Sequence, residues 1–191
     1  MAGAVFMGLP NLRRVGNCLC FKTRIYLTCK VSSLMSKAKK IRILDLRPIT
    51  LAKVDFQGNF HGIGKAYQKL MYWVRHHGFT NSSKNKTLTI YYDDPNVVGI
   101  NNVRQSACII VDTQIESAGE ITRLDFKPGK CAVGRFEISF FEFKDAWVEM
   151  HQWIRDNNLK ITGKSFEVYQ NNSNKHPLKK NIIDICIPIE S

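Results

Sequence analysis

The segment of this sequence whose side chains are best suited to binding or catalysis is a short strand-like run, Phe166-Glu167-Val168-Tyr169. Side chains alternate along a strand, so Glu167 and Tyr169 share one face of it. An unpaired charge is costly to bury, and Glu167 should therefore be paired with a cation, exposed to solvent or functional. In an aromatic cleft, desolvation would raise the pKa of Glu167, and a cationic ligand would favour its charged form.

Aromatic side chains that could line such a cleft lie on two helical segments, which match at an offset of 80 residues. Apolar residues recur at spacings of three and four in both segments, which predicts amphipathic helices near 61–77 and 141–157. Trp73 aligns with Trp153, and both are predicted to be core residues. Tyr67 aligns with Trp147, and this pair could equally pack in the core or touch a ligand.

Strand-like segments surround both helices. Those before the helices are 41–46 with 50–57 and 120–126 with 130–138, and those after them are 86–92, 107–111, 166–169 and 182–189. The pattern predicts an α+β fold of duplicated βαββ units: a curved antiparallel sheet, two helices on one face and a ligand cleft at the pseudo-twofold axis. Because there is one helix for four strands, we expect part of the opposite sheet face to stay accessible as a concave surface.

Glu167 interrupts the repeat. At an offset of 77 residues Tyr169 aligns with Tyr92, and Glu167 aligns with Ile90, so one half has a carboxylate where the other has an apolar side chain. If this carboxylate has no fixed partner in the empty protein, Glu167→Gln should leave stability unchanged or raise it. The same change should weaken binding of a cation.

Composition limits the size of the domain and the range of partners. The 191 residues, 44% of them hydrophobic, suffice for one well-buried core. Residues 1–34 hold five basic residues and no acid, so the net charge of +12 leaves +7 for the remainder, and we expect no specific nucleic-acid partner. We expect residues 1–34 to be a disordered or untranslated extension ahead of Met35, and residues 35–191 to form the binding domain.

Metal, cofactor and membrane sites are not indicated by the sequence. The six cysteines form no CxxC pair, and the histidines do not cluster at metal-ligand spacing, so we expect neither a metal nor a cofactor. Cys108 and Cys186 lie in apolar runs and should pack as small hydrophobic residues. No stretch approaches the ~18–20 apolar residues needed to cross a bilayer, and a cytoplasmic protein without membrane contact is expected.

Several motifs in residues 41–189 resemble the GyrI-like small-molecule-binding family, which includes stand-alone DNA gyrase inhibitory proteins and the effector-binding domains of AraC- and MerR-type regulators. They are YYDDP at Tyr91–Pro95, FKPGKCAV at Phe126–Val133, FEVYQNN at Phe166–Asn172 and DICIPI at Asp184–Ile189. The resemblance implies the duplicated βαββ fold and places the family's pocket glutamate at Glu167. It implies aromatic pocket walls at Tyr67, Trp147 and Tyr169. Family patterns often read Arg-x-Asp where this chain has Arg104-Gln105-Ser106.

Three functions are compatible with the family resemblance, and direct nucleic-acid binding is a fourth that rests on the basic charge alone. The first is a stand-alone binding protein for hydrophobic, cationic small molecules, which sequesters or senses toxins or drugs. Residues 1–40 are too short for the DNA-reading domain of the family's regulators, which favours a stand-alone binder over a transcription factor. The alternatives are a modulator of DNA gyrase through protein contact, and a hydrolase of electrophilic small molecules in which Glu167 is the general acid or base. We expect binding at Glu167, Tyr169, Tyr67 and Trp147 rather than catalysis.

Overall fold

The computed structural model describes residue 38 and residues 40–79, 86–111 and 115–190. The predicted N-terminal extension, residues 1–34, lies outside this part. The first half contains β1 (Ile41–Leu46), β2 (Ile49–Gln57), a 3-10 turn (Phe60–Ile63), α1 (Gly64–His76), β3 (Thr87–Tyr91), α2 (Pro95–Val98), a second 3-10 turn (Ile100–Asn102) and β4 (Arg104–Val111). The second half contains β5 (Thr122–Phe126), β6 (Gly129–Ile138), a 3-10 turn (Phe140–Glu142), α3 (Phe143–Asp156), β7 (Lys160–Ile161), β8 (Phe166–Tyr169), a 3-10 turn (Ser173–Lys175) and β9 (Asn181–Glu190).

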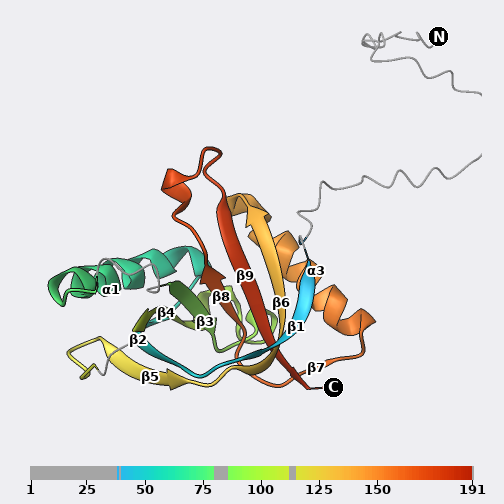
Figure 1. Cartoon of the computed structure of the whole chain (residues 1–191), viewed down its shortest axis with the longest axis horizontal. Helices are drawn as coiled ribbons and strands as arrows, with labels where there is room; N and C mark the ends of the chain where they lie inside the picture. The colour runs from blue at the N-terminus through green and yellow to red at the C-terminus, as the bar shows by residue number, and fades with distance from the viewer. Residues whose placement is uncertain (1–37, 39, 80–85, 112–114, 191) are drawn as a thin grey trace, which may run out of the picture. The chain divides into compact units, whose positions relative to one another are not determined.

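The strands form an antiparallel sheet in the order β1-β6-β9-β8-β3-β4-β2-β5, and β7 pairs with β9 outside this path. Figure 1 shows the two long helices, α1 and α3, well separated, with β3 and β8 between them. The predicted α+β class, with an antiparallel sheet and two helices, is confirmed. Within the described part of the chain, no helix is long and apolar enough to span a bilayer.

The strand order reads the same from either end when β1 is matched with β5, β2 with β6, β3 with β8 and β4 with β9. In this arrangement the first strand of each half pairs with the second strand of the other half: β1 pairs with β6, and β5 pairs with β2. The central pair is β3 and β8. Superposition of the two halves about a twofold axis stays a prediction, and any such axis would pass between these two strands.

Two short links curl the sheet. β1 and β2 are joined by Arg47-Pro48, and β5 and β6 by Lys127-Pro128, yet in each pair the strands lie toward opposite ends of the sheet order. Two linking residues span only about 10 Å, so the ends of the sheet must approach each other. On the inside of the curl, Phe126 of the edge strand β5 packs on Phe166 of the central strand β8 with ring centroids 5.1 Å apart.

The inside of the curl is filled by apolar side chains. Its buried members are Leu51, Leu88, Ile90, Cys108, Cys131, Phe166 and Cys186. The predicted packing of Cys108 and Cys186 as buried hydrophobic residues is therefore confirmed. Our expectation of an accessible concave surface on the face opposite the helices was wrong, because the curled sheet covers that face with its own strands.

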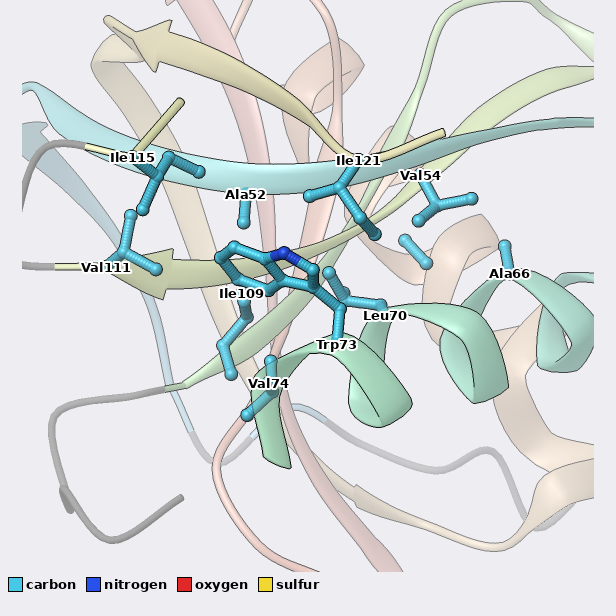
Figure 2. Packing of buried hydrophobic residues seen from close by; sticks show 11 residues of the cluster. Ala52, Val54, Ala66, Leu70, Trp73, Val74, Ile109, Val111, Ile115 and Ile121 are labelled. Carbon is cyan, nitrogen blue, oxygen red and sulfur yellow. The ribbon is translucent and has the colours of Figure 1, made fainter. Parts of the chain in front are cut away.

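Both helices lie on the other face of the sheet. From α1, the side chains of Leu70, Trp73 and Val74 point toward β2 and β4, where they meet Ala52 and Ile109 (Figure 2). On α3, the buried residues Ala146, Met150 and Ile154 pack on β6 and β9. Ser139 caps the 3-10 turn that leads into α3 in a capping box, with its backbone N donating to Glu142 Oε2 at 2.7 Å. The space over β3 and β8 therefore lies between the two helices.

Candidate functional site

Glu167 lies on β8 in the middle of the sheet, and its side chain is only 1% exposed. Its face of the strand is the helix face, since Glu167 pairs in register with Ile185 of the α3 core. Trp147 Nε1 donates to Glu167 Oε1 at 2.5 Å, and the Tyr169 hydroxyl donates to Oε2 at 2.9 Å. The Tyr91 hydroxyl is a third hydrogen-bond partner of the carboxylate. Glu167 is thus buried, and its carboxylate accepts hydrogen bonds from aromatic side chains.

Aromatic rings from both helices and both central strands surround this carboxylate. The rings of Tyr91 and Trp147 meet edge to face, with centroids 5.5 Å apart. Tyr67 of α1 meets Tyr169 in the same way at 6.2 Å. Phe60, just before α1, packs on Tyr91 at 5.7 Å. Tyr67, Tyr91, Trp147 and Tyr169 are each only partly buried, so these residues keep some exposed surface.

Thr89 joins the two tyrosines. Its side chain is fully buried on β3, and Thr89 is the register partner of Glu167 on β8. The distance from its Oγ1 is 2.9 Å to the Tyr67 hydroxyl and 3.2 Å to the Tyr169 hydroxyl. A continuous hydrogen-bonded path therefore runs from Tyr67 through Thr89 and Tyr169 to Glu167. We call Glu167, Tyr169, Tyr91, Thr89, Tyr67 and Trp147 the Glu167 cluster.

Burial dominates the electrostatics of the cluster. Desolvation raises the pKa of Glu167, and the hydrogen bonds from Trp147, Tyr169 and Tyr91 oppose this shift without cancelling it. Desolvation likewise raises the pKa values of Tyr67, Tyr91 and Tyr169, so these phenols keep their protons at neutral pH. Glu167 is the acidic group of the cluster, and its charge depends on the donors around it.

The structure brings all four predicted site residues together: Glu167 contacts Trp147 and Tyr169 directly, and Tyr67 through Thr89. Whether they bind a ligand stays a prediction. Our assumption that the carboxylate has no fixed partner in the empty protein was wrong, because three donors hold it. A ligand cannot touch Glu167 unless one of the surrounding rings moves.

The sequence reasoning missed Thr89 and Tyr91 because it aligned the central strands at the wrong offset. Residues that are equivalent in a repeated sheet should lie on the same face of it, and Ile90 and Glu167 do not. Ile90, the residue predicted to match Glu167, packs with Phe166 inside the curl. The register places Thr89 directly beside Glu167, and Tyr91, two residues further along β3, shares the face of Thr89. Side chains two residues apart on a strand share a face, and this rule could have shown that Thr89 and Tyr91 point to the same side of β3.

Arg104 is held by an acid from another motif. Its Nε and Nη2 donate to Asp93 Oδ2 and Oδ1 at 2.9 and 2.6 Å, and these hydrogen bonds hold the pKa of Asp93 at about 2. Ser106, which stands where family patterns often have Asp, hydrogen-bonds to the Asp55 carboxylate and to the Tyr92 hydroxyl. The Asp93 carboxylate of YYDDP thus pairs with this arginine.

A separate groove of about 480 Å³ lies between α1 and the segment of Glu120 and Ile121. It is lined by Gln68, Lys69, Tyr72, Trp73, His76, His77, Glu120 and Ile121, and we call it the α1 groove. None of the four predicted site residues is among this lining. Within the described residues, no group of three histidine, cysteine or acidic side chains is arranged to hold a metal ion.

Comparisons with solved structures show the same fold. The EcmrR–DNA complex in EcmrR-RPo is 16% identical with a TM-score of 0.69, over 80% of this chain and 57% of that chain. The chain thus spans little more than half the length of EcmrR. An uncharacterized conserved protein from Listeria innocua is 16% identical with a TM-score of 0.63, over 80% of this chain and 93% of that one. A hydrolase from Listeria innocua is 15% identical with a TM-score of 0.59, over the same shares of 80% and 93%.

Comparison with protein families gives a more specific result. No curated protein matches the sequence. The GyrI-like small molecule binding domain, however, matches residues 39–190, which include the whole described sheet and both long helices. The chain belongs to the GyrI-like small molecule binding domain family.

Proposed function

We propose that this protein binds small hydrophobic cations at the Glu167 cluster and thereby sequesters or senses toxic compounds or drugs. The observation that carries the proposal is a buried carboxylate whose hydrogen-bond donors are all aromatic side chains, located between the two helices of a domain from a small-molecule-binding family. Aromatic faces attract cations by roughly 0.5–2 kcal/mol each. The three phenols keep their protons, so Glu167 supplies the negative charge of the cluster.

The charge of Glu167 can act on a ligand even without direct contact. Two opposite charges about 6 Å apart attract each other by about 3 kcal/mol at an effective dielectric constant of about 20. Trp147 donates through its in-plane N–H, so Glu167 lies at the edge of the indole ring, and a cation on a face of that ring would be about this far from the carboxylate. A cation stacked on the outer side of these rings would therefore still be favoured over a neutral molecule of the same shape.

A matched pair of probes tests this proposal. N-Methylquinolinium is a cation, and 1-methylnaphthalene is a neutral molecule of nearly the same shape. The wild-type protein should bind the cation more tightly. Glu167→Gln should weaken cation binding about 10- to 100-fold, the value of a charge-assisted contact of about 1.5–3 kcal/mol, and should change binding of the neutral probe little.

The control for this experiment is Glu120→Gln, which removes a carboxylate from the α1 groove. Glu120 pairs with Lys69 and lies outside the Glu167 cluster. Calorimetric titration of both variants with both probes therefore distinguishes binding at the Glu167 cluster from binding in the α1 groove. If Glu120→Gln abolishes cation binding while Glu167→Gln leaves it intact, the ligand occupies the α1 groove and the proposal is wrong.

A second candidate is hydrolysis of electrophilic small molecules, favoured by the contact between the Glu167 carboxylate and the Tyr169 hydroxyl. A carboxyl group of raised pKa beside a phenol can activate water and protonate a leaving oxygen. Styrene oxide is a suitable probe, because addition of water across its C–O bond gives phenylethanediol. Glu167-dependent formation of the diol would support hydrolysis, and its absence would leave binding as the function.

Modulation of DNA gyrase stays a prediction from the resemblance of the sequence. A supercoiling assay with the purified protein tests it. Unchanged gyrase activity at high excess of the protein would exclude this role.

A further inference from the structure

The hydroxyl groups of Tyr67, Thr89 and Tyr169 form a chain that ends at Glu167. Successive distances along it are 2.9 Å, 3.2 Å and 2.9 Å, and Thr89 occupies the middle position. Each of the three hydroxyls carries one proton and can donate only one hydrogen bond. The direction of every bond in the chain is therefore fixed by the group at its end.

An ionised Glu167 sets one direction. A carboxylate only accepts hydrogen bonds, so Tyr169 donates to Glu167. The Tyr169 oxygen must then accept from Thr89, since its own proton is already used, and Thr89 must accept from Tyr67 for the same reason. All three protons point toward Glu167, and the Tyr67 oxygen is left with lone pairs.

Protonation of Glu167 reverses the chain. The indole N–H of Trp147 can only donate, so Glu167 Oε1 continues to accept from it, and the added proton sits on Oε2. Glu167 then donates to Tyr169, Tyr169 donates to Thr89, and Thr89 donates to Tyr67. Each hydroxyl rotates and keeps its own proton. The Tyr67 O–H is released from the chain and can donate to another molecule.

We propose that Thr89 is a positioning residue that couples Tyr67 to Glu167, so that Tyr67 presents lone pairs to a ligand while Glu167 is ionised and presents its O–H when Glu167 is protonated. This inference rests on the proposed binding function, because it concerns the polarity that the same site shows to a ligand. Thr89 is the one residue of the chain on β3, and it links the residue from α1 to the two residues from β8.

Within the described part of the chain, other titratable groups also lie close to Glu167. Tyr91 from β3 is hydrogen-bonded to the carboxylate, and Tyr169 and Tyr67 belong to the chain itself. The His151 ring of α3 lies beside Trp147 with ring centroids 5.9 Å apart, and the pKa of His151 is lowered chiefly by burial. Tyr91 is not part of the hydroxyl chain from Tyr67 to Glu167, so it is left unchanged in every variant used below.

The first experiment measures the titration of the Glu167 side-chain carboxyl by carbon NMR in the full chain. Thr89→Val keeps the shape and removes the hydroxyl, which weakens Tyr169 as a donor, so the titration midpoint should rise by roughly a few tenths of a pH unit. Tyr67→Phe should raise it less, because Tyr67 acts at one step further. Thr89→Ser keeps a hydroxyl and should restore the wild-type midpoint.

The double variant is the sharpest test of the chain. If Tyr67 reaches Glu167 only through Thr89, then Tyr67→Phe should add no shift in the Thr89→Val background. Shifts that simply add, or a Thr89→Ser midpoint equal to that of Thr89→Val, would overturn the proposal. This measurement uses no ligand, so it judges the hydroxyl chain even if the proposed binding function fails.

The second experiment uses quinoline N-oxide, a neutral molecule with a strong hydrogen-bond acceptor. Its affinity for the wild-type protein should increase as the pH falls through the titration of Glu167, because Tyr67 then offers its O–H. In Thr89→Val the Tyr67 proton is free at every pH, so the affinity should lose this pH dependence. A pH dependence that persists in Thr89→Val would contradict the coupling, whereas absence of binding at any pH would count against the proposed function.

Discussion

Replacement of Trp147 by Phe tests the best-defined contact of the Glu167 cluster. The change removes the indole N–H that donates to Glu167 Oε1 at 2.5 Å and leaves a ring in the same place. Loss of a hydrogen bond to a buried charge costs about 1.5–3 kcal/mol. The smaller ring removes about 40 Å² of apolar contact, worth about 1 kcal/mol. We therefore expect Trp147→Phe to lower the free energy of unfolding by about 3 kcal/mol in total.

The assay is urea denaturation at neutral pH, with Trp73→Phe as the matched control. Trp73 is a buried tryptophan of α1 whose Nε1 has no hydrogen-bond partner within the described residues. Its replacement should cost only packing, about 1 kcal/mol. The difference between the variants should shrink in the Glu167→Gln background, where the N–H meets a neutral amide oxygen. Equal costs for both variants, unchanged in that background, would refute the assigned hydrogen bond.

Three further predictions concern single groups. Tyr91→Phe removes one donor to the carboxylate and should raise the pKa of Glu167 further, so that NMR titration shows protonation beginning at a higher pH. Burial raises the pKa of the Cys131 thiol to about 12, so iodoacetamide should modify Cys131 slowly in the folded protein and rapidly in urea. Mass spectrometry of the peptide that contains Cys131 would measure this modification. Rapid modification without urea would contradict the prediction. Arg104→Gln should return the pKa of Asp93 from about 2 toward its ordinary range, and the contribution of this pair to stability, present above the unfolded pKa of Asp93, should be lost as pH falls toward about 2.

The pH dependence of stability follows from the direction of the Glu167 shift. The folded pKa lies above the unfolded value, so ionisation of Glu167 costs stability. This cost is absent below the unfolded pKa, grows as the pH rises toward the folded pKa, and is fully present above it. Glu167→Gln should remove this pH dependence, because the glutamine amide is uncharged at every pH, like the protonated carboxyl group.

Much of the fold could be predicted because it depends on local periodicity. Spacings of three and four marked α1 and α3, and alternation on Phe166-Glu167-Val168-Tyr169 placed Glu167 and Tyr169 on one face. The same spacing placed Tyr67 and Trp147 on the apolar helix faces, and the family resemblance assigned them to the pocket. These patterns are set within one segment and do not require knowledge of which strands are neighbours.

What the sequence did not show depends on contacts between distant segments. The pairing of β1 with β6 and of β5 with β2 is set by links of two residues that curl the sheet, and periodicity carries no trace of it. Thr89 and Tyr91 were missed because an error of one residue in the alignment of two strands moves every side chain to the other face. The donors that hold Glu167 could be named only once the register was known.

The most direct test of a ligand site at the Glu167 cluster is a crystal structure of the protein with N-methylquinolinium bound. The account predicts the ring of the ligand stacked on the aromatic side chains of the cluster, between α1 and α3, with its charged nitrogen within about 6 Å of an aromatic ring centre and on the side nearest Glu167. Ligand density confined to the α1 groove, or no ligand density at the Glu167 cluster at saturating ligand, would contradict it.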